Sequence, residues 1–433
     1  MLVVGGGCAG LSAATALAER GARVRLLEAR AVLGGRARSW TDPRTGEVED
    51  NGRHLVMACY ESFLRMARRT GGADALRFQP RAEVVLLREG GGRTAFRPEE
   101  MPGRAGLLSG LVRLRGFPLR AVPGAGAALR EAREECAALD GSSAAAWLSR
   151  HGQDAAAREA LWDPLVLATV NLSPETAPAR LVASVLRRAL LAGEGGSRIG
   201  FADRGLDAAI AGPAEIHLRG RGGEVLRRRK VESIELDGRG RFVAARCRSG
   251  ERHEAGALVL AVPHREAGAL VPPSAAPPTA PAWRDLGESP IVSVRLRLDR
   301  PTGAPEMAGL VRSPVHWVFR GRERGAGGPE RLALVTSAAD GLAGRGRDEI
   351  VALAVSEIRR FLPLARGARV VGALVLKERR ATPRFTPENL AARPGPGTGS
   401  PNLVLAGDWT DTGLPATLEG AALSGERAAA ALG

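Results

Sequence analysis

The first ten residues constrain the fold most strongly. Residues 2–4 form a short apolar run that predicts a buried strand. The next segment has the spacing G-x-G-x-x-G, given by Gly5, Gly7 and Gly10. In such a unit the first glycine permits a tight turn, the second lets a pyrophosphate approach the backbone, and the third lets the next helix pack on the strand. A second predicted strand ends in Glu28, 18 positions after Gly10, where an acid binds a ribose hydroxyl. The sequence therefore predicts an α/β unit that holds a dinucleotide.

A segment near the other end of the chain completes this unit. Residues 403–406 predict another buried strand, and Gly407 and Asp408 form the turn that follows it. A helix is expected to begin near Thr417. A carboxylate at a strand end and free N–H groups at a helix start suit a cofactor with a polyhydroxy chain and an electron-rich ring. Because the two segments lie at opposite ends, the chain between them must fold back to join them.

Length and composition place limits on the architecture. At 433 residues with 44% hydrophobic residues, the chain is long enough for two interlocked domains. It contains no run of 18 apolar residues, and the nucleotide unit starts at residue 2. We therefore expect a protein of the cytoplasm or of the cytoplasmic membrane face. The four cysteines are widely spread and form no C-x-x-C pair, so we expect no metal site and no disulfide: Cys8, Cys59, Cys136 and Cys247.

The charge is strongly basic but unpatterned. The net charge is +15, and 60 of the 62 basic residues are arginines scattered along the chain. With one tyrosine and no interleaving of basic and aromatic residues, binding of nucleic acid is disfavoured. Attraction to anionic lipid head groups is the better interpretation, and it makes peripheral contact with a membrane a prediction.

The alternation of strand-like and helical segments divides the chain into five stretches. The nucleotide-binding domain is predicted from residues 1–72, 196–271 and 393–433. The substrate domain is predicted from residues 73–195 and 272–392. Three strand-rich stretches separated by other material indicate one discontinuous domain, because a parallel sheet can recruit strands that are far apart in sequence.

The substrate domain is predicted to have a helical and a sheet part. Residues 143–192 have a helical pattern that is interrupted near residues 171–174. Residues 290–385 alternate as strands around one helix near residues 348–362, which suits a sheet forming the floor of a substrate cavity. Residues 106–119 carry apolar residues at helical spacing with arginines opposite. This segment is either an interfacial helix that rests on a membrane or a helix that covers a pocket.

The motifs, taken in order, resemble those of the flavin amine-oxidase and phytoene-desaturase superfamily. The resemblance includes the glycine loop and Glu28, followed by Gly35 with Arg36, Val231, and Gly407 with Asp408. It implies the α/β class, with a discontinuous Rossmann-like FAD-binding domain and an α+β substrate domain, as in amine oxidases.

The same resemblance assigns roles around FAD. Glu28 would hold the adenosine ribose, Arg36 would approach the pyrophosphate, and the backbone of Val231 would touch adenine. Asp408 would bond the pyrophosphate or ribityl region, and N–H groups around Leu418 would face the flavin N1/C2 carbonyl. The full set of residues implied at the cofactor is Gly5, Gly7, Cys8, Ala9, Gly10, Glu28, Ala29, Arg30, Gly35, Arg36, Val231, Gly407, Asp408 and Leu418. Within it, Cys8 is interpreted as a small packing residue rather than a redox group.

A narrower resemblance covers nearly the whole chain. Residues 50–55, 147–153, 162–174 and 407–420 are similar to the squalene-associated FAD-dependent desaturases, the hydroxysqualene dehydroxylase family of hopanoid and squalene biosynthesis. The resemblance implies reductive removal of a hydroxyl group from a C30 isoprenoid alcohol, with reduced FAD as hydride donor. The partner would be a long-chain isoprenoid held in a dry apolar tunnel.

Such a reaction needs an acid near the leaving oxygen. His54 follows a turn expected near the flavin, and Asp163 lies in the helical substrate region, so each is a candidate. Each also has a plainer interpretation: His54 as a residue that only packs or bonds near the cofactor, and Asp163 as the cap of a helix before Pro164.

Other functions remain open from the sequence. The same flavin frame could desaturate a carotenoid precursor such as phytoene. A non-catalytic flavin-bound isoprenoid carrier is an alternative of another class. An amine oxidase is disfavoured, since an aromatic cage for the amine is hard to build with one tyrosine. One glycine fingerprint leaves the electron donor unidentified, so we expect a free nicotinamide cofactor or a separate reductase.

Overall fold

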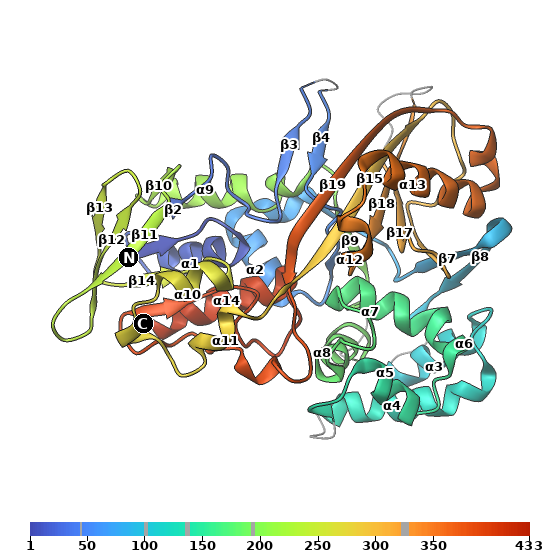
Figure 1. Ribbon diagram of the computed structural model, residues 1–433, viewed down its shortest axis with the longest axis horizontal. Coiled ribbons are helices and arrows are strands. Elements are labelled where there is room, and N and C mark those ends of the chain that lie inside the picture. Colours follow the sequence, from blue (N-terminus) through green and yellow to red (C-terminus); the bar gives the residue numbers. More distant parts are fainter. Residues whose placement is uncertain (44–45, 99–102, 135–138, 192–194, 322–328) are drawn as a thin grey trace.

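Figure 1 shows an α/β unit that holds both ends of the chain, a large sheet with a long helix on one side, and a group of helices below that sheet. The computed structural model describes residues 1–43, 46–98, 103–134, 139–191, 195–321 and 329–433. Cys136 lies outside the described residues.

The α/β unit is built on a five-stranded parallel sheet in the order β10-β2-β1-β14-β20. Its strands are β1 (Leu2–Val4), β2 (Arg25–Glu28), β10 (Glu224–Arg227), β14 (Leu258–Leu260) and β20 (Leu403–Leu405). The three strands β1, β14 and β20 are wholly buried, as their uninterrupted apolar sequences require in a sheet covered on both faces. The sheet takes strands from all three predicted nucleotide-binding stretches, while their outer boundaries stay a prediction.

Helices cover this sheet. They are α1 (Cys8–Glu19), α2 (Glu61–Thr70), α9 (Ala211–Gly220), α10 (His264–Leu270), α11 (Ala280–Arg284) and α14 (Leu418–Ala431). Helices α1 and α14 lie directly against each other, although they come from opposite ends of the chain (Figure 1). The Ser12 hydroxyl donates to the carbonyl oxygen of Ala422 at 2.8 Å, a bond between residues 410 positions apart. A Cβ placed on Gly425 would collide with the carbonyl oxygen of Ala9. Small residues therefore let the two helix backbones approach closely.

Three small sheets surround this core. One contains β11 (Val231–Leu236), β12 (Phe242–Cys247) and β13 (Arg252–Glu254). A second pairs β3 (Ser39–Thr41) with β4 (Val48–Asp50). The third contains β5 (Val56–Met57), β6 (Leu76–Phe78) and β9 (Ile199–Ala202), in the order β5-β9-β6. Strand β9 follows the helices of residues 103–191 in the chain and pairs with β5 and β6, which precede those helices. The third sheet therefore joins the two ends of this helical segment.

The large sheet has seven strands in the order β19-β15-β18-β17-β16-β7-β8. They are β7 (Val84–Arg88), β8 (Gly92–Phe96), β15 (Glu288–Leu298), β16 (Met307–Leu310), β17 (Trp317–Arg320), β18 (Glu330–Thr336) and β19 (Val370–Pro383). All pairs are antiparallel except β16 with β7. Helix α13 (Arg347–Phe361) packs on one face of this sheet, where side chains of the helix and of the sheet form one apolar cluster. The short helix α12 (Asp340–Ala343) precedes α13 in the chain. The face of the sheet opposite to α13 forms part of the wall of a cavity.

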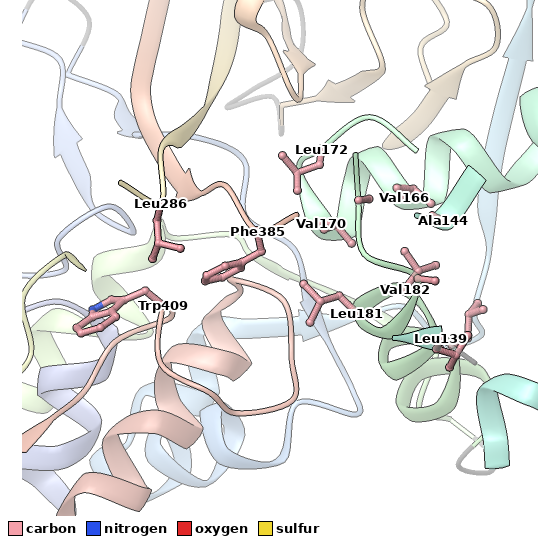
Figure 2. Close-up of a cluster of buried hydrophobic side chains, with 14 of the residues drawn as sticks. Leu139, Ala144, Val166, Val170, Leu172, Leu181, Val182, Leu286, Phe385 and Trp409 are labelled. Atoms are coloured by element: carbon pink, nitrogen blue, oxygen red, sulfur yellow. The ribbon is translucent and has the colours of Figure 1, made fainter. Parts of the chain in front are cut away.

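The remaining helices form the third group. They are α3 (Gly103–Arg113), α4 (Val122–Glu134), α5 (Ala144–Arg150), α6 (Ala155–Ala157), α7 (Asp163–Val170) and α8 (Ala179–Leu186). Their buried side chains belong to the same apolar cluster as Trp409 of the α/β unit. Figure 2 shows Phe385 between Trp409 and Leu286 on one side and Leu181 and Val170 of the helices on the other. This continuous core fixes the helical group relative to the α/β unit.

Several expected elements are confirmed, and others were not foreseen. The helix expected near residues 348–362 is α13, and the helix expected near Thr417 begins at Leu418. Strands β7 and β8 had no counterpart in the sequence analysis, which described helical patterns at residues 106–119 and 143–192 and no strand between residues 73 and 195. The two strands pair with each other at the edge of the large sheet, and β7 also pairs with β16. Because the pairing of β7 with β16 is non-local, no local sequence pattern indicates it.

Replacing Gly425 by alanine tests the contact between α1 and α14. The added methyl group meets the Ala9 carbonyl, so Gly425→Ala is expected to lower the free energy of unfolding by about 1–3 kcal/mol, measured by urea denaturation. The control is Gly220→Ala in α9, where a Cβ meets nothing within 4 Å. Equal stability of the two variants would contradict this description of the contact.

Candidate active site

A cavity of about 670 Å³ lies between the α/β unit and the large sheet. One part of its wall comes from the glycine loop, the end of β2 and the start of α14. Another part comes from the large sheet and helix α7. The sequence-predicted cofactor residues all line this cavity except Gly10, which lies behind the loop.

The glycine loop and the start of α1 form a cradle for an anion. Gly5 has a φ angle of +108°, and a side chain there would collide with the carbonyl oxygen of Ala261. Among the described residues, no side chain caps α1, so the N–H groups of its first turn remain available. Cys8 and Ala9 of that turn line the cavity. A pyrophosphate fits this position because the exposed N–H groups and the helix dipole both favour negative charge.

Cys8 fills the space between the two helix starts. Its thiol lies 3.6 Å from the carbonyl oxygen of Leu418. Burial, with Glu419 and Asp408 nearby, raises the pKa of the Cys8 thiol to about 12. The group therefore stays a neutral thiol, which agrees with its interpretation as a packing residue.

Glu28 is held rigidly at the end of β2. One carboxylate oxygen accepts the N–H of Gly6 at 2.7 Å, and the other accepts the N–H of Arg30 at 2.7 Å. Each carboxylate oxygen can accept a second hydrogen bond. Glu28, Ala29 and Arg30 all line the cavity, so the free acceptor positions suit the two hydroxyl groups of a ribose.

Arg36 and Asp408 join separate parts of the chain at the cavity wall. The guanidinium donates to the Asp408 carboxylate at 2.6 Å and to the carbonyl oxygen of Ala381 in β19 at 2.9 Å. Although burial works against the charged form, Asp408 raises the pKa of Arg36 above its usual range. Arg36 therefore remains a cation next to the glycine loop, where a pyrophosphate would carry negative charge.

The start of α14 provides a second set of N–H groups. The Thr417 side chain caps this helix by accepting the N–H of Gly420 at 3.1 Å, and Leu418 lines the cavity. The first-turn acid, Glu419, is directed elsewhere: it accepts the N–H groups of Ser62 and Phe63 at 3.2 and 2.9 Å. The positive end of the α14 dipole is thus left for a ligand. Val231 also lines the cavity, at the start of β11.

His54 lies at the cavity, as the sequence analysis expected for a residue near the cofactor. Its Nδ1–H donates to the carbonyl oxygen of Gly52 at 2.9 Å, so the neutral ring keeps Nε2 as an acceptor. Burial lowers the pKa of His54 below its usual range, despite the bond to Gly52. At neutral pH the ring is therefore uncharged, and it must first take up a proton before it can act as an acid.

The placement of Asp163 disfavours it as the acid. Asp163 does not line the cavity; its carboxylate pairs with Arg158, with the nearest oxygen 3.0 Å from Nε. It lies at the start of α7, directly before Pro164, where a carboxylate favours the helix start. Its pKa is raised, chiefly by burial, although the pairing with Arg158 works in the opposite direction. This position outside the cavity wall favours the interpretation of Asp163 as a residue that stabilises the helix start, and its role as an acid stays a prediction.

The large sheet forms part of the cavity wall, as the sequence analysis expected for residues 290–385, but the sequence analysis named none of the side chains involved. The part of this wall formed by β15, β16, β17 and β18 includes Ile291, Ser293, Met307, Trp317, Phe319 and Val335, and β19 adds the polar residues Glu378, Arg380 and Thr382. The only sequence signal for them is the alternation within β15, in which Val292 and Val294 pack toward α13 while Ile291 and Ser293 line the cavity. That alternation does not say which face a ligand would contact.

The fold and this cradle define a dinucleotide-dependent oxidoreductase with an adjoining apolar cavity. The family model described as flavin containing amine oxidoreductase matches residues 8–433. The hydroxysqualene dehydroxylase of Rhodopseudomonas palustris is 33% identical, covering 99% of this chain and 96% of the relative. That of Sinorhizobium fredii is 32% identical with the same coverage, and the 15-cis-phytoene desaturase of Synechococcus elongatus is 25% identical over 99% of this chain and 95% of its own.

Solved structures agree on the fold. A putrescine oxidase bound to putrescine has a TM-score of 0.72 at 18% identity, covering 99% of this chain and 97% of its own. An oxidoreductase from Methanosarcina mazei has a TM-score of 0.74 at 14% identity, covering 98% of each chain. The chain belongs to the flavin-containing amine oxidoreductase family, in the branch that includes the two hydroxysqualene dehydroxylases. It is an FAD-dependent oxidoreductase, and the cradle described above fits that cofactor.

Replacing Glu28 by glutamine tests the ribose position. One oxygen becomes an NH₂ group that faces a backbone N–H, and the charged acceptor is lost, so the dissociation constant for FAD is expected to rise about tenfold or more. Flavin fluorescence titration of apoprotein with a wild-type circular dichroism spectrum measures this. Glu349→Gln, at an exposed acid of α13, is the control. Unchanged affinity in Glu28→Gln would contradict the assignment.

Proposed function

We propose that this protein removes the hydroxyl group of hydroxysqualene reductively to give squalene. The observation that supports this most directly is one cavity that combines the FAD cradle with an apolar wall from the large sheet. A long isoprenoid chain needs such a wall, because its many methyl and methylene groups are stabilised by removal from water. The relatives named hydroxysqualene dehydroxylase align with 99% of the chain.

The reaction replaces a C–OH bond by a C–H bond and releases water. Reduced FAD supplies the hydride, and one proton is needed by the departing oxygen. The residues of this chain contribute in other ways. The apolar wall would exclude water, and the start of α14 would favour negative charge on a flavin ring bound next to it. We propose His54 as the proton carrier at Nε2, since its lowered pKa makes the protonated ring a ready donor.

A second candidate is desaturation of a phytoene-type carotenoid precursor. It is favoured by the same apolar wall and by the 25% identity to the phytoene desaturase of Synechococcus elongatus. This reaction runs in the opposite redox direction, since the substrate loses hydrogen to oxidised FAD. A non-catalytic carrier would bind the isoprenoid and perform neither reaction.

Anaerobic incubation with hydroxysqualene tests the proposed function. With chemically reduced FAD, the protein is expected to form squalene, detected by mass spectrometry, and protein stripped of FAD is expected to form none. A parallel incubation supplies phytoene and oxidised FAD. Phytoene desaturation without squalene formation would contradict the proposal, and binding of hydroxysqualene without either product would favour the carrier.

We also propose that residues 112–120 rest on an anionic membrane surface, from which the substrate would be drawn. None of the described helices is both long and apolar enough to cross a bilayer. Val112 and Leu119 are 54% and 66% exposed. Exposed arginines lie around them at positions 113, 115 and 120. Exposed apolar side chains next to basic ones suit the boundary between lipid head groups and acyl chains.

The double variant Val112→Asp/Leu119→Asp tests this surface. Both substitutions place charge where lipid contact is proposed, so flotation with vesicles of phosphatidylglycerol is expected to fall at least fivefold. Ile216→Asp is the matched control, because Ile216 is 74% exposed on α9 of the α/β unit. Equal flotation of the double variant and this control would contradict the proposal.

A further inference from the structure

Two polar side chains lie in one row across the apolar part of the wall that β15, β18 and β17 form. Strands β15, β18 and β17 are neighbours (Figure 1), with Ser293 paired to Val335 and Val335 paired to Trp317. Residues directly opposite each other in an antiparallel sheet project from the same face, and all three line the cavity. Since strands lie about 4.8 Å apart, the backbones of Ser293 and Trp317 are about 10 Å apart, within reach of a common ligand.

Both side chains are buried without a hydrogen-bond partner. Ser293 is 1% exposed and Trp317 is 8% exposed. Neither the Ser293 hydroxyl nor the Trp317 indole N–H has a partner among the described residues. Buried polar groups in folded proteins are nearly always paired, so two orphans in one row of a sheet need a physical reason.

Comparable groups elsewhere in the molecule are satisfied. The four other buried tryptophans donate their indole N–H groups within the chain: Trp147 to Glu131, Trp162 to Gln153, Trp283 to Thr279 and Trp409 to Val262. The cavity-lining amide of Asn171 is also satisfied, since it donates to Thr382 at 2.9 Å and accepts the N–H of Ala338 at 2.7 Å. Other buried atoms without a partner among the described residues belong to arginine, histidine and glutamate side chains, including Arg229, His264 and Glu266 at the cavity. Ser293 and Trp317 contribute the hydroxyl and the indole N–H in this set.

The surroundings of the pair define what could satisfy it. The neighbouring cavity residues Ile199, Ile291, Met307, Phe319 and Val335 are apolar. A ligand here must bring an oxygen that accepts hydrogen bonds on an otherwise apolar body. A hydroxyl oxygen can accept from both the serine and the indole, and the serine oxygen can accept the proton of that hydroxyl in return.

We infer that Ser293 and Trp317 form the binding site for the hydroxyl group of an isoprenoid alcohol. This inference rests on the proposed function and concerns where the oxygen is held. It predicts a preference for an alcohol over a hydrocarbon, because phytoene or squalene would leave both donors unpaired. It also favours release of the product, which has lost the oxygen that the pair binds.

The variants Ser293→Ala and Trp317→Phe remove one donor each and keep an apolar side chain in place. Each is expected to weaken binding of hydroxysqualene to the FAD-bound protein about tenfold, and to leave binding of squalene unchanged or tighter. Anaerobic titration followed by flavin absorbance measures both ligands. Each variant is also expected to keep or raise the melting temperature, since it removes an unpaired buried donor.

Ser184→Ala and Trp147→Phe are the matched controls. They make the same changes where the donor already has a partner in the chain and does not line the cavity. They are expected to lower the melting temperature and to leave the affinity for hydroxysqualene unchanged. This opposite pattern separates a ligand-binding donor from one that only supports the fold.

The outcomes distinguish this inference from the proposed function. If the wild-type protein forms squalene while Ser293→Ala and Trp317→Phe bind hydroxysqualene normally, the inference is wrong and the proposed function stands. If the wild-type protein forms no squalene but the variants lose affinity for the alcohol alone, the inference stands and the reaction assignment is wrong. Equal affinity of the wild-type protein for hydroxysqualene and squalene would overturn the inference directly.

Discussion

The close contact between helices α1 and α14 is the constraint on which the rest of the structure depends. Gly425 and Ser12 let the two backbones approach, and the Ser12 hydroxyl bonds the carbonyl oxygen of Ala422. As a result the two helices start at the same edge of the parallel sheet, one beside the glycine loop and the other beside Asp408. Both positive dipole ends then face a single cavity, which neither end of the chain could form alone. The two ends thus build one site for FAD, with the remaining chain looped between them.

The cofactor side of the site was largely predictable from the sequence. Gly5, Glu28 and the segment from Gly407 to Leu418 occupy short motifs whose spacing follows from backbone geometry, so their neighbours in the chain indicate their role. Their places at the cavity agree with that expectation, while their contacts with FAD remain predictions. The helix α13 and the strands of the parallel sheet were also recognisable, because each has a clear apolar pattern.

The substrate side was not predictable in the same way. The row that joins Ser293 to Trp317 depends on the register of three strands separated by loops, and sequence patterns do not fix such non-local pairing. Asp163 was an attractive acid by its position near Trp162, yet its carboxylate pairs with Arg158 outside the cavity. Burial and pairing decide the chemistry of a side chain, and both are properties of the assembled fold.

The two halves of the cavity use different physical means. Charges and backbone N–H groups line the part proposed for the cofactor, whereas apolar side chains around Ser293 and Trp317 line the part proposed for the substrate. This division fits a reaction in which a long hydrocarbon is placed by burial and its one oxygen is placed by hydrogen bonds. It also gives a reason why a shared family fold can serve both alcohols and hydrocarbons, since the donor pair can change without disturbing the cradle.

The most direct test of the central claim is a single-turnover measurement of electron flow. Protein whose bound FAD has been fully reduced is mixed anaerobically with hydroxysqualene, and flavin absorbance near 450 nm is followed together with the amount of squalene formed. The account predicts that oxidised flavin appears and that one squalene forms for each flavin oxidised. A flavin that stays reduced in the presence of hydroxysqualene, or an oxidised flavin that phytoene reduces, would contradict it.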